Sequence, residues 1–175
     1  MYSGDFKENQ KDGRGTLDWP NGDKYEGEFA SDNLNGFGIF SYQCGRVYKG
    51  NWKDGKRCGT GELTLPSGDR YSGEFLDNYL NGPCDCQFAD GSVYKGNMVN
   101  SRKEGKGEFI WSTGERYFGE FKNCLRDGYG TYYFTDGTIF KGNWKNDLEH
   151  GQGLIEKNGE VEEGEWEKGV KKVGN

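Results

Sequence analysis

Residues 25–40, YEGEFASDNLNGFGIF, contain the pattern that decides the fold, because this pattern returns every 23 residues along the chain. Each return has a glycine at the same place, an aromatic residue two positions before it and a bulky residue two positions after it. These glycines are Gly4, Gly27, Gly50, Gly73, Gly96, Gly119 and Gly142. A fixed internal period indicates a repeat array, in which each repeat contacts mainly its neighbours.

Each repeat predicts two β-strands. Residues 25–30 alternate between a ring or glycine and a polar residue, which is the period of two expected of a strand. Residues 129–134 represent the second strand, and turn pairs such as Asp136-Gly137 separate one repeat from the next. So many glycines disfavour helices. We expect the rings and these glycines on one face of a sheet and mostly polar residues on the other.

The segments Tyr25-Glu26-Gly27-Glu28-Phe29 and Asn35-Gly36-Phe37-Gly38 resemble the MORN (membrane occupation and recognition nexus) repeat. The resemblance implies an all-β fold, a single-layer twisted antiparallel sheet of stacked 23-residue hairpins that stays open and forms a groove. We expect seven repeats in 2–161, followed by a partial eighth repeat and a charged C-terminal cap or tail in 162–175. The seven are 2–24, 25–47, 48–70, 71–93, 94–116, 117–139 and 140–161.

Composition disfavours several classes of partner. The net charge of −6 argues against a nucleic-acid binder, since such proteins are usually basic. No apolar run approaches the roughly 20 residues that a membrane helix needs, and residues 1–20 lack the apolar core of a signal peptide. The 5 cysteines are odd in number and lack the spacing of a disulfide framework. This pattern favours a reduced, cytoplasmic setting.

No motif predicts catalysis. His150 is the one histidine, and it occupies a turn-like position without an evident nucleophile or orienting acid. Cys84 and Cys86 are too close in sequence for a usual zinc ligand pair, and the phosphate-loop signature is absent. We therefore expect a protein that is not an enzyme, with no catalytic residue, no metal and no cofactor.

Two surfaces are candidates for binding a partner. The first is an apolar patch on the polar face, where strand pairing is expected to put three side chains next to one another with a fourth nearby; these are Ile110, Phe118 and Tyr133, with Tyr129. Such a patch marks an interaction site, unless a tail or loop covers it. The second is an aromatic groove suited to a peptide helix, unless its rings pack only on one another. Its predicted rings are Tyr25, Tyr48, Trp52, Tyr71, Tyr94, Trp111 and Tyr117.

The resemblance implies a non-catalytic scaffold or adaptor for protein partners in a ciliary, axonemal or membrane-associated cytoskeletal assembly, with homodimerisation as one option. Its alternatives are a phospholipid-binding module, supported only by a row of Lys49, Lys95 and Lys141, and a regulatory segment of a larger lipid kinase or lysine methyltransferase. The first repeat begins at Tyr2 without a polar cap, so either the array is longer than this chain or its edge strand meets a partner.

Overall fold

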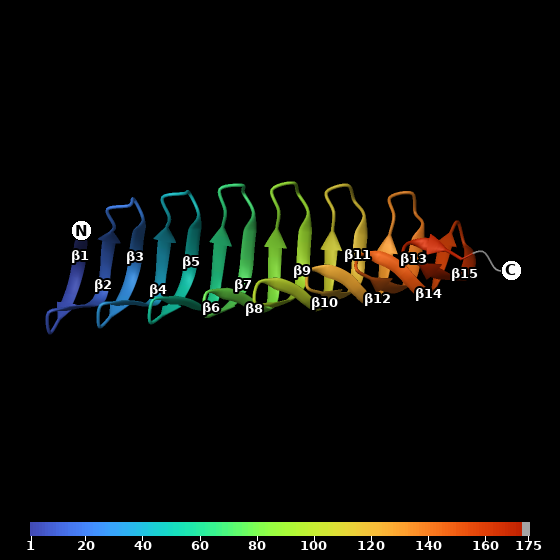
Figure 1. Cartoon of the computed structure of the whole chain (residues 1–175). Helices are drawn as coiled ribbons and strands as arrows, with labels where there is room; N and C mark the ends of the chain where they lie inside the picture. Colours follow the sequence, from blue (N-terminus) through green and yellow to red (C-terminus); the bar gives the residue numbers. More distant parts are fainter. Residues whose placement is uncertain (173–175) are drawn as a thin grey trace. The chain divides into compact units, whose positions relative to one another are not determined.

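The computed structural model describes residues 1–172, which form antiparallel strands and turns and no helix. The chain divides into an N-terminal unit, Met1–Ala89, and a C-terminal unit, Asp90–Asn175. Within each unit, every strand pairs with the strand that precedes or follows it in sequence, and hairpin turns alternate between the two ends of the strands (Figure 1). The predicted all-β antiparallel repeat fold is confirmed.

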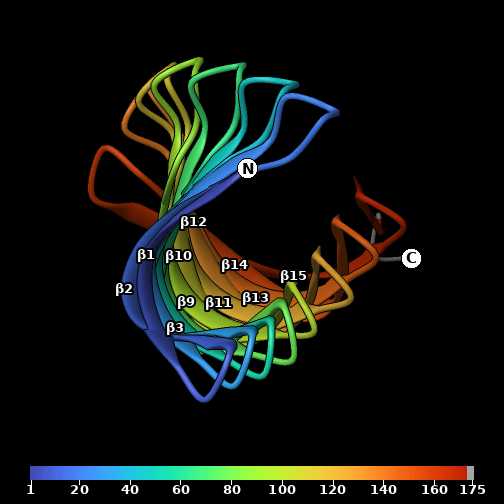
Figure 2. The same ribbon diagram turned by 90° about the vertical axis from the view of Figure 1, so that its left-hand side faces the viewer.

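The N-terminal unit contains eight strands. They are β1 (Tyr2–Lys7), β2 (Gln10–Asp18), β3 (Lys24–Ala30), β4 (Asn33–Ser41), β5 (Val47–Lys53), β6 (Lys56–Thr64), β7 (Arg70–Leu76) and β8 (Tyr79–Gln87). The C-terminal unit contains β9 (Val93–Val99), β10 (Arg102–Ile110), β11 (Arg116–Lys122), β12 (Leu125–Tyr133), β13 (Ile139–Lys145), β14 (Leu148–Lys157), β15 (Glu160–Glu167) and β16 (Val170–Lys171). The strands bend along their length, as the view in Figure 2 shows.

The second strand of each repeat is longer than the sequence predicts. β12 begins at Leu125, four residues before the expected start at Tyr129. The difference arises because the two strands of a repeat are joined by a two-residue turn, such as Ser31-Asp32, in which both residues have positive φ angles of 45° and 68°. Both angles match a turn that closes a hairpin tightly, so pairing starts directly after it.

A β-bulge also lies inside each hairpin. Between β3 and β4 the register shifts between Gly27 and Phe29, and Gly36 adopts a φ of +63° there. The carboxylate of Glu28 lies over Gly36, where a β-carbon would collide with it. A glycine that suggests the end of a strand in the sequence therefore marks a bulge within one.

Consecutive repeats are joined by a recurring contact at the two-residue turn that links the two strands of a repeat. The carboxylate oxygen Oδ1 of Asp32 accepts hydrogen bonds from the backbone N–H of Lys11 at 3.0 Å and from its Nζ at 2.8 Å. The backbone N–H of Asp32 donates in return to the carbonyl of Lys11 at 3.0 Å. Asn78 with Arg57, and Asp147 with Arg126, repeat this arrangement. The contact fixes how each hairpin sits against the one before it.

The partial eighth repeat continues the sheet. Gly164 of β15 pairs with Gly153 of β14, and the ring of Trp166 packs edge-on against Phe140 at 5.0 Å between centroids. This repeat has Glu162 where the others have a ring, and the side chain of Lys171 fills that space over Gly164. The charged tail predicted for 162–175 is described only to residue 172; residues 173–175 lie outside the described part.

Candidate functional site

The predicted ring-and-glycine face, here called the aromatic face, is held together by a tyrosine that lies across two glycines. In repeat 2, a β-carbon on either Gly27 or Gly38 would come within 3 Å of the Tyr25 side chain. The Tyr25 hydroxyl donates a hydrogen bond to the carbonyl of Glu28 at 3.0 Å. The same geometry recurs at Tyr48, Tyr94 and Tyr117. Glycine at both positions is therefore required by the ring above it.

Burial separates the predicted groove rings into two groups. Five of the seven are buried, with at most 4% of their surface exposed; these are Tyr25, Tyr48, Trp52, Tyr94 and Tyr117. Burial raises the pKa of the Tyr25 hydroxyl to about 12. These five rings form the core of the array, so a partner cannot reach them. Only Tyr71 and Trp111 are half-exposed.

A second layer of rings lies over the buried ones and is only half-buried. In the N-terminal unit, Phe40 stacks on Tyr42 at 4.3 Å and on Trp19 at 5.2 Å between centroids. In the C-terminal unit, Trp111 packs at a tilt of 51° against Phe109, with 4.6 Å between centroids. These rings come from the ends of second strands and the turns that follow them. They are the part of the aromatic face that a ligand can contact.

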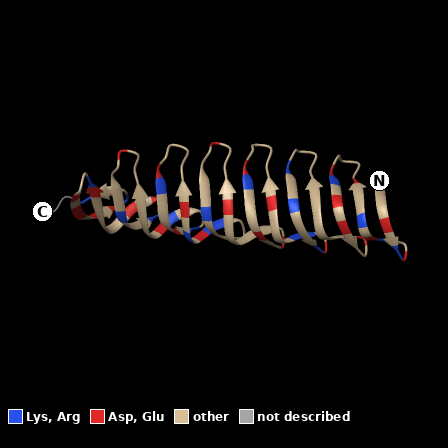
Figure 3. Ribbon diagram, turned by 180° about the vertical axis from the view of Figure 1, so that it is seen from behind, with Lys and Arg blue, Asp and Glu red and all other residues tan. Residues whose placement is uncertain are grey.

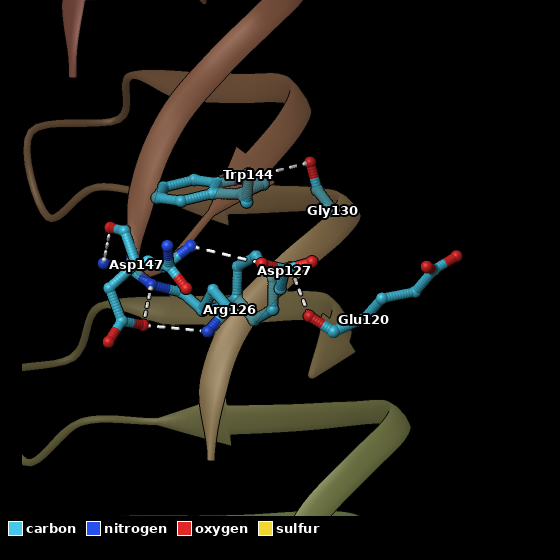
Figure 4. A network of polar contacts seen from close by, with 8 residues as sticks. Glu120, Arg126, Asp127, Gly130, Trp144 and Asp147 are labelled. Carbon is cyan, nitrogen blue, oxygen red and sulfur yellow. Dashed lines mark hydrogen bonds and ion pairs between the residues drawn. The ribbon is translucent and has the colours of Figure 1, made fainter. Parts of the chain in front are cut away.

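Positive side chains also lie on the aromatic face, which the sequence reasoning did not predict. The guanidinium carbon of Arg126 lies 4.2 Å from the Trp144 ring centroid and 5.2 Å from that of Tyr132 (Figure 4). Its Nε donates to a carboxylate oxygen of Asp147 at 3.1 Å. Arg57 occupies the same place three repeats earlier, 5.5 Å from the Tyr48 ring centroid. Cations stacked on rings in this way stabilise the packing and supply charge to the face.

One position of the repeat does indicate in the sequence that cations lie on the aromatic face. The residue nine positions after each leading ring is Lys11, Leu34, Arg57, Leu80, Lys103, Arg126 and Glu149. A position that holds either leucine or a long cationic side chain in six of seven repeats is expected to pack against apolar groups, because lysine and arginine stems bury readily. In the structure, the charged groups of Lys11, Arg57, Lys103 and Arg126 each lie within 5.9 Å of a ring centroid.

The predicted patch on the polar face is partly assembled. Phe118 and Tyr129 are 53% and 57% exposed, whereas Ile110 and Tyr133 are half-buried. Ile110 and Tyr133 are not adjacent, because Arg116 pairs with Ile110 on one side and with Tyr133 on the other. The Arg116 guanidinium lies 5.3 Å from the Tyr133 ring centroid and forms an ion pair with Glu108. The patch is therefore apolar at Phe118 and charged beside it.

The polar face carries both signs of charge at close range. Along the strands of each unit, basic and acidic residues are interspersed (Figure 3). Lys49 pairs across strands with Glu62 and Lys95 with Glu108, and the Lys141 ammonium lies 3.0 Å from the Glu156 carboxylate. Each lysine of the row expected to favour lipid binding therefore faces a glutamate.

The histidine and cysteines considered as candidates for catalysis or metal binding do not converge on one site. His150 is half-buried in β14. The Sγ atoms of Cys84 and Cys86 lie 3.7 Å apart on β8. Within residues 1–172, no group of three or more His, Cys, Asp or Glu side chains is arranged to hold a metal ion. The same residues contain no helix of the length and apolarity that crossing a bilayer requires.

Comparison with solved structures shows similarity of fold. One is the TCP domain of Drosophila melanogaster SAS-4 (dCPAP) in complex with a proline-rich motif of Ana2, with 14% identity, a TM-score of 0.53, and coverage of 86% of this chain and 82% of that chain. Another is the TCP10 domain of Danio rerio CPAP in complex with a peptide of STIL, with 16% identity, a TM-score of 0.56, and coverage of 93% and 74%. No curated protein matches the sequence.

A family model for the MORN repeat matches seven successive segments of the chain. The segments are 2–24, 25–43, 48–70, 71–93, 94–116, 117–139 and 140–156. They coincide with the seven hairpins, in six of which a ring covers paired glycines; in 71–93, Cys84 stands in place of the second glycine. Together the segments account for most of the sequence. The chain belongs to the MORN-repeat family.

Proposed function

We propose that this chain is a non-catalytic scaffold that holds a segment of a protein partner against its aromatic face. The observation that carries the proposal is the layer of half-exposed rings at Trp19, Phe40 and Tyr42, with Phe109 and Trp111 in the second unit. Partly exposed rings gathered in this way are costly to leave in water, and rigid aromatic side chains are favoured contact residues.

The two similar structures support the choice of a peptide as the partner. Both are complexes, one with a proline-rich motif and one with a peptide, on domains whose fold this chain resembles. A one-layer sheet presents its rings along its whole length, which suits an extended or helical segment better than a small compact ligand. The partner segment is accordingly proposed to run across several hairpins.

The proposed cell setting rests on the resemblance to other MORN-repeat arrays. We infer a cytoplasmic scaffold within a cytoskeletal, ciliary or axonemal assembly, because MORN-type arrays resemble modules found there. A regulatory segment of a larger enzyme remains an alternative reading of the same surface. The phospholipid alternative loses its main support, since Lys49, Lys95 and Lys141 each face a glutamate.

The polar face offers a second interaction surface. Phe118 and Tyr129 are more than half exposed. Charged side chains lie near Phe118, with Glu108 beside it in the register and Arg116 two pairs further along. Apolar side chains in such a charged setting favour a second copy of the chain or another protein.

The experiment that tests the proposed function uses the full chain to select from a displayed library of random short peptides. Selected peptides are then titrated by fluorescence anisotropy against the wild type, Trp19→Ser on the aromatic face and Phe118→Ser on the polar face. We expect Trp19→Ser, and not Phe118→Ser, to weaken binding. A wild-type chain that enriches no peptide would contradict the proposal.

A further inference from the structure

The loop between repeats 2 and 3 departs from its equivalents at Arg46. In the flanking repeats the same position is aspartate, and Asp23 and Asp69 each accept a hydrogen bond at 2.8 Å from a backbone N–H one repeat later, of Gln43 and Ala89. The residue that would donate to position 46 is Pro66, which has no N–H. An acceptor is not needed at position 46, so an arginine is tolerated there.

Arg46 turns its guanidinium onto the aromatic face. Its guanidinium carbon lies 4.0 Å from the centroid of the Tyr42 ring. Tyr42 stacks in turn on Phe40, which lies 5.7 Å from Trp52 between centroids. Trp52 pairs across strands with Arg57. The two arginines therefore belong to one cluster of rings within the N-terminal unit.

Arg57 lacks the counter-charge that its equivalent has. Arg126 is neutralised by the carboxylate of Asp147, whereas Arg57 meets the amide of Asn78 at the same place. The Asn78 Oδ1 accepts the backbone N–H of Arg57 at 3.0 Å, and the Asn78 carbonyl accepts Nη2 at 2.8 Å. These bonds preserve the geometry of the joint between repeats without removing the positive charge.

The two arginines are also incompletely bonded. The Nε of Arg46 and the Nη1 of Arg57 are buried without a hydrogen-bond partner, and neither residue takes part in an ion pair within residues 1–172. Burial, together with the positive charge of Arg46, lowers the pKa of Arg57. Two like charges held together in partial burial without an anion are unfavourable.

We propose that the Arg46–Arg57 pair binds an anionic group on the partner peptide, a carboxylate or a phosphorylated side chain, which stands beside apolar residues seated on Trp19, Phe40 and Tyr42. Arg46 makes the direct contact, and Arg57 beneath it contributes positive charge. Arginine suits this task because its guanidinium forms two parallel hydrogen bonds to a carboxylate or phosphate. The inference rests on the proposed peptide-binding function and specifies the chemistry of the peptide.

The test begins with the composition of the peptides that the wild-type chain selects from the random library. We expect enrichment of aspartate and glutamate next to apolar residues. One selected peptide is then synthesised with its acidic residue as glutamate, as glutamine and as phosphoserine, so that the carboxylate and phosphate sources are compared directly. The glutamine form is expected to bind at least about tenfold more weakly than a charged form.

Variants of the chain assign the effect to the pair. Arg46→Asp introduces the residue found at positions 23 and 69, and Arg57→Leu introduces the residue found at positions 34 and 80, so both fit the repeat. Each is expected to remove the preference for the charged peptide. Lys49→Glu makes the same change of charge as Arg46→Asp on the polar face and serves as the control.

The outcomes separate this inference from the proposed function. Selection of peptides without acidic enrichment, or a preference that survives Arg46→Asp, would overturn the inference and leave peptide binding standing. An equal loss of preference in Lys49→Glu would show that the effect comes from overall charge and would overturn the inference as well. Failure of the wild type to select any peptide would contradict both the inference and the proposed function. Circular dichroism of each variant checks that the sheet is retained.

Discussion

Arg126 donates its backbone N–H and its guanidinium Nε to the same carboxylate oxygen of Asp147, at 2.9 and 3.1 Å. Its Nη2 donates to the Asp147 carbonyl at 2.7 Å. Because Asp147 lies in the turn of the following repeat, one residue joins two hairpins and neutralises a cation enclosed by rings. Stability at this joint therefore depends on a charge as well as on apolar packing.

Removing that carboxylate should destabilise the C-terminal unit. Asp147→Ala is expected to lower the free energy of unfolding by about 2 kcal/mol, because the partly buried guanidinium keeps its charge and loses its acceptor. Urea unfolding followed by tryptophan fluorescence measures the change. Asp77→Ala is the control, since Asp77 also lies at positive φ in a turn but pairs with the exposed Lys56, so its loss should cost little beyond the backbone strain that both substitutions share. Equal effects of the two substitutions would contradict this account.

The glycines beneath the tyrosines should not tolerate a methyl group. In Gly119→Ala the new β-carbon would collide with the Tyr117 ring and the backbone of Gly130, at an expected cost of about 3 kcal/mol. Gly137→Ala is the comparison, since nothing lies within 4 Å of its β-carbon and only its φ of +84° is unfavourable. That strain costs about 1 kcal/mol. Thermal unfolding of the two variants would contradict the role of the ring if Gly137→Ala were the more damaging.

The buried tyrosines should make the protein sensitive to alkali. Burial raises the pKa of Tyr25 from 10.0 to about 12, so the folded state retains a proton that the unfolded state loses. The contribution is complete below pH 10 and is lost as the pH rises to about 12, by roughly 2–3 kcal/mol. Urea midpoints measured across this range should fall more steeply for the wild type than for Tyr25→Phe. Parallel curves would rule out Tyr25 as a source of the sensitivity.

Self-association, if it uses the polar face, should depend on the exposed rings of the C-terminal unit. The double change Phe118→Ser and Tyr133→Ser is expected to lower the mass measured by light scattering at high concentration, with the circular dichroism spectrum unchanged. Phe37→Ser alters another exposed ring on the polar face, 47% exposed in the N-terminal unit, and should have no such effect. An unchanged mass in the double variant would exclude this patch as a self-association surface.

The repeat pattern predicts the fold because each structural rule acts within one repeat. In six of the seven repeats the ring that starts the repeat lies over glycines two and thirteen positions later, as Tyr25 does over Gly27 and Gly38. Repeat 4 is the exception, with Cys84 at the second of these positions. One 23-residue period is therefore enough to predict which strands pair, which face each side chain occupies and which rings form the core. The start of the second strand was wrong because Gly36 forms a bulge, and a bulge and a strand end look alike in a sequence.

The candidate site was harder to predict, because it depends on differences between repeats. The sequence places Tyr25 and Trp111 on the same face but does not show that the first is buried and the second half-exposed. The position of Arg116 between Ile110 and Tyr133 follows only from the register. Arg46 stands out only once the missing N–H of Pro66 is set beside the hydrogen bonds of Asp23 and Asp69.

The pairing of each strand with its neighbour in sequence has a consequence for how the protein folds. Contacts within each unit span about one repeat of chain, so the loops that must close during folding stay short. Such low contact order favours fast folding for an all-β protein. Adding repeats to the array does not lengthen the loops that must close, so the loop-closure entropy per repeat stays the same. Local opening is then expected to begin at individual hairpins, which hydrogen exchange would resolve one repeat at a time.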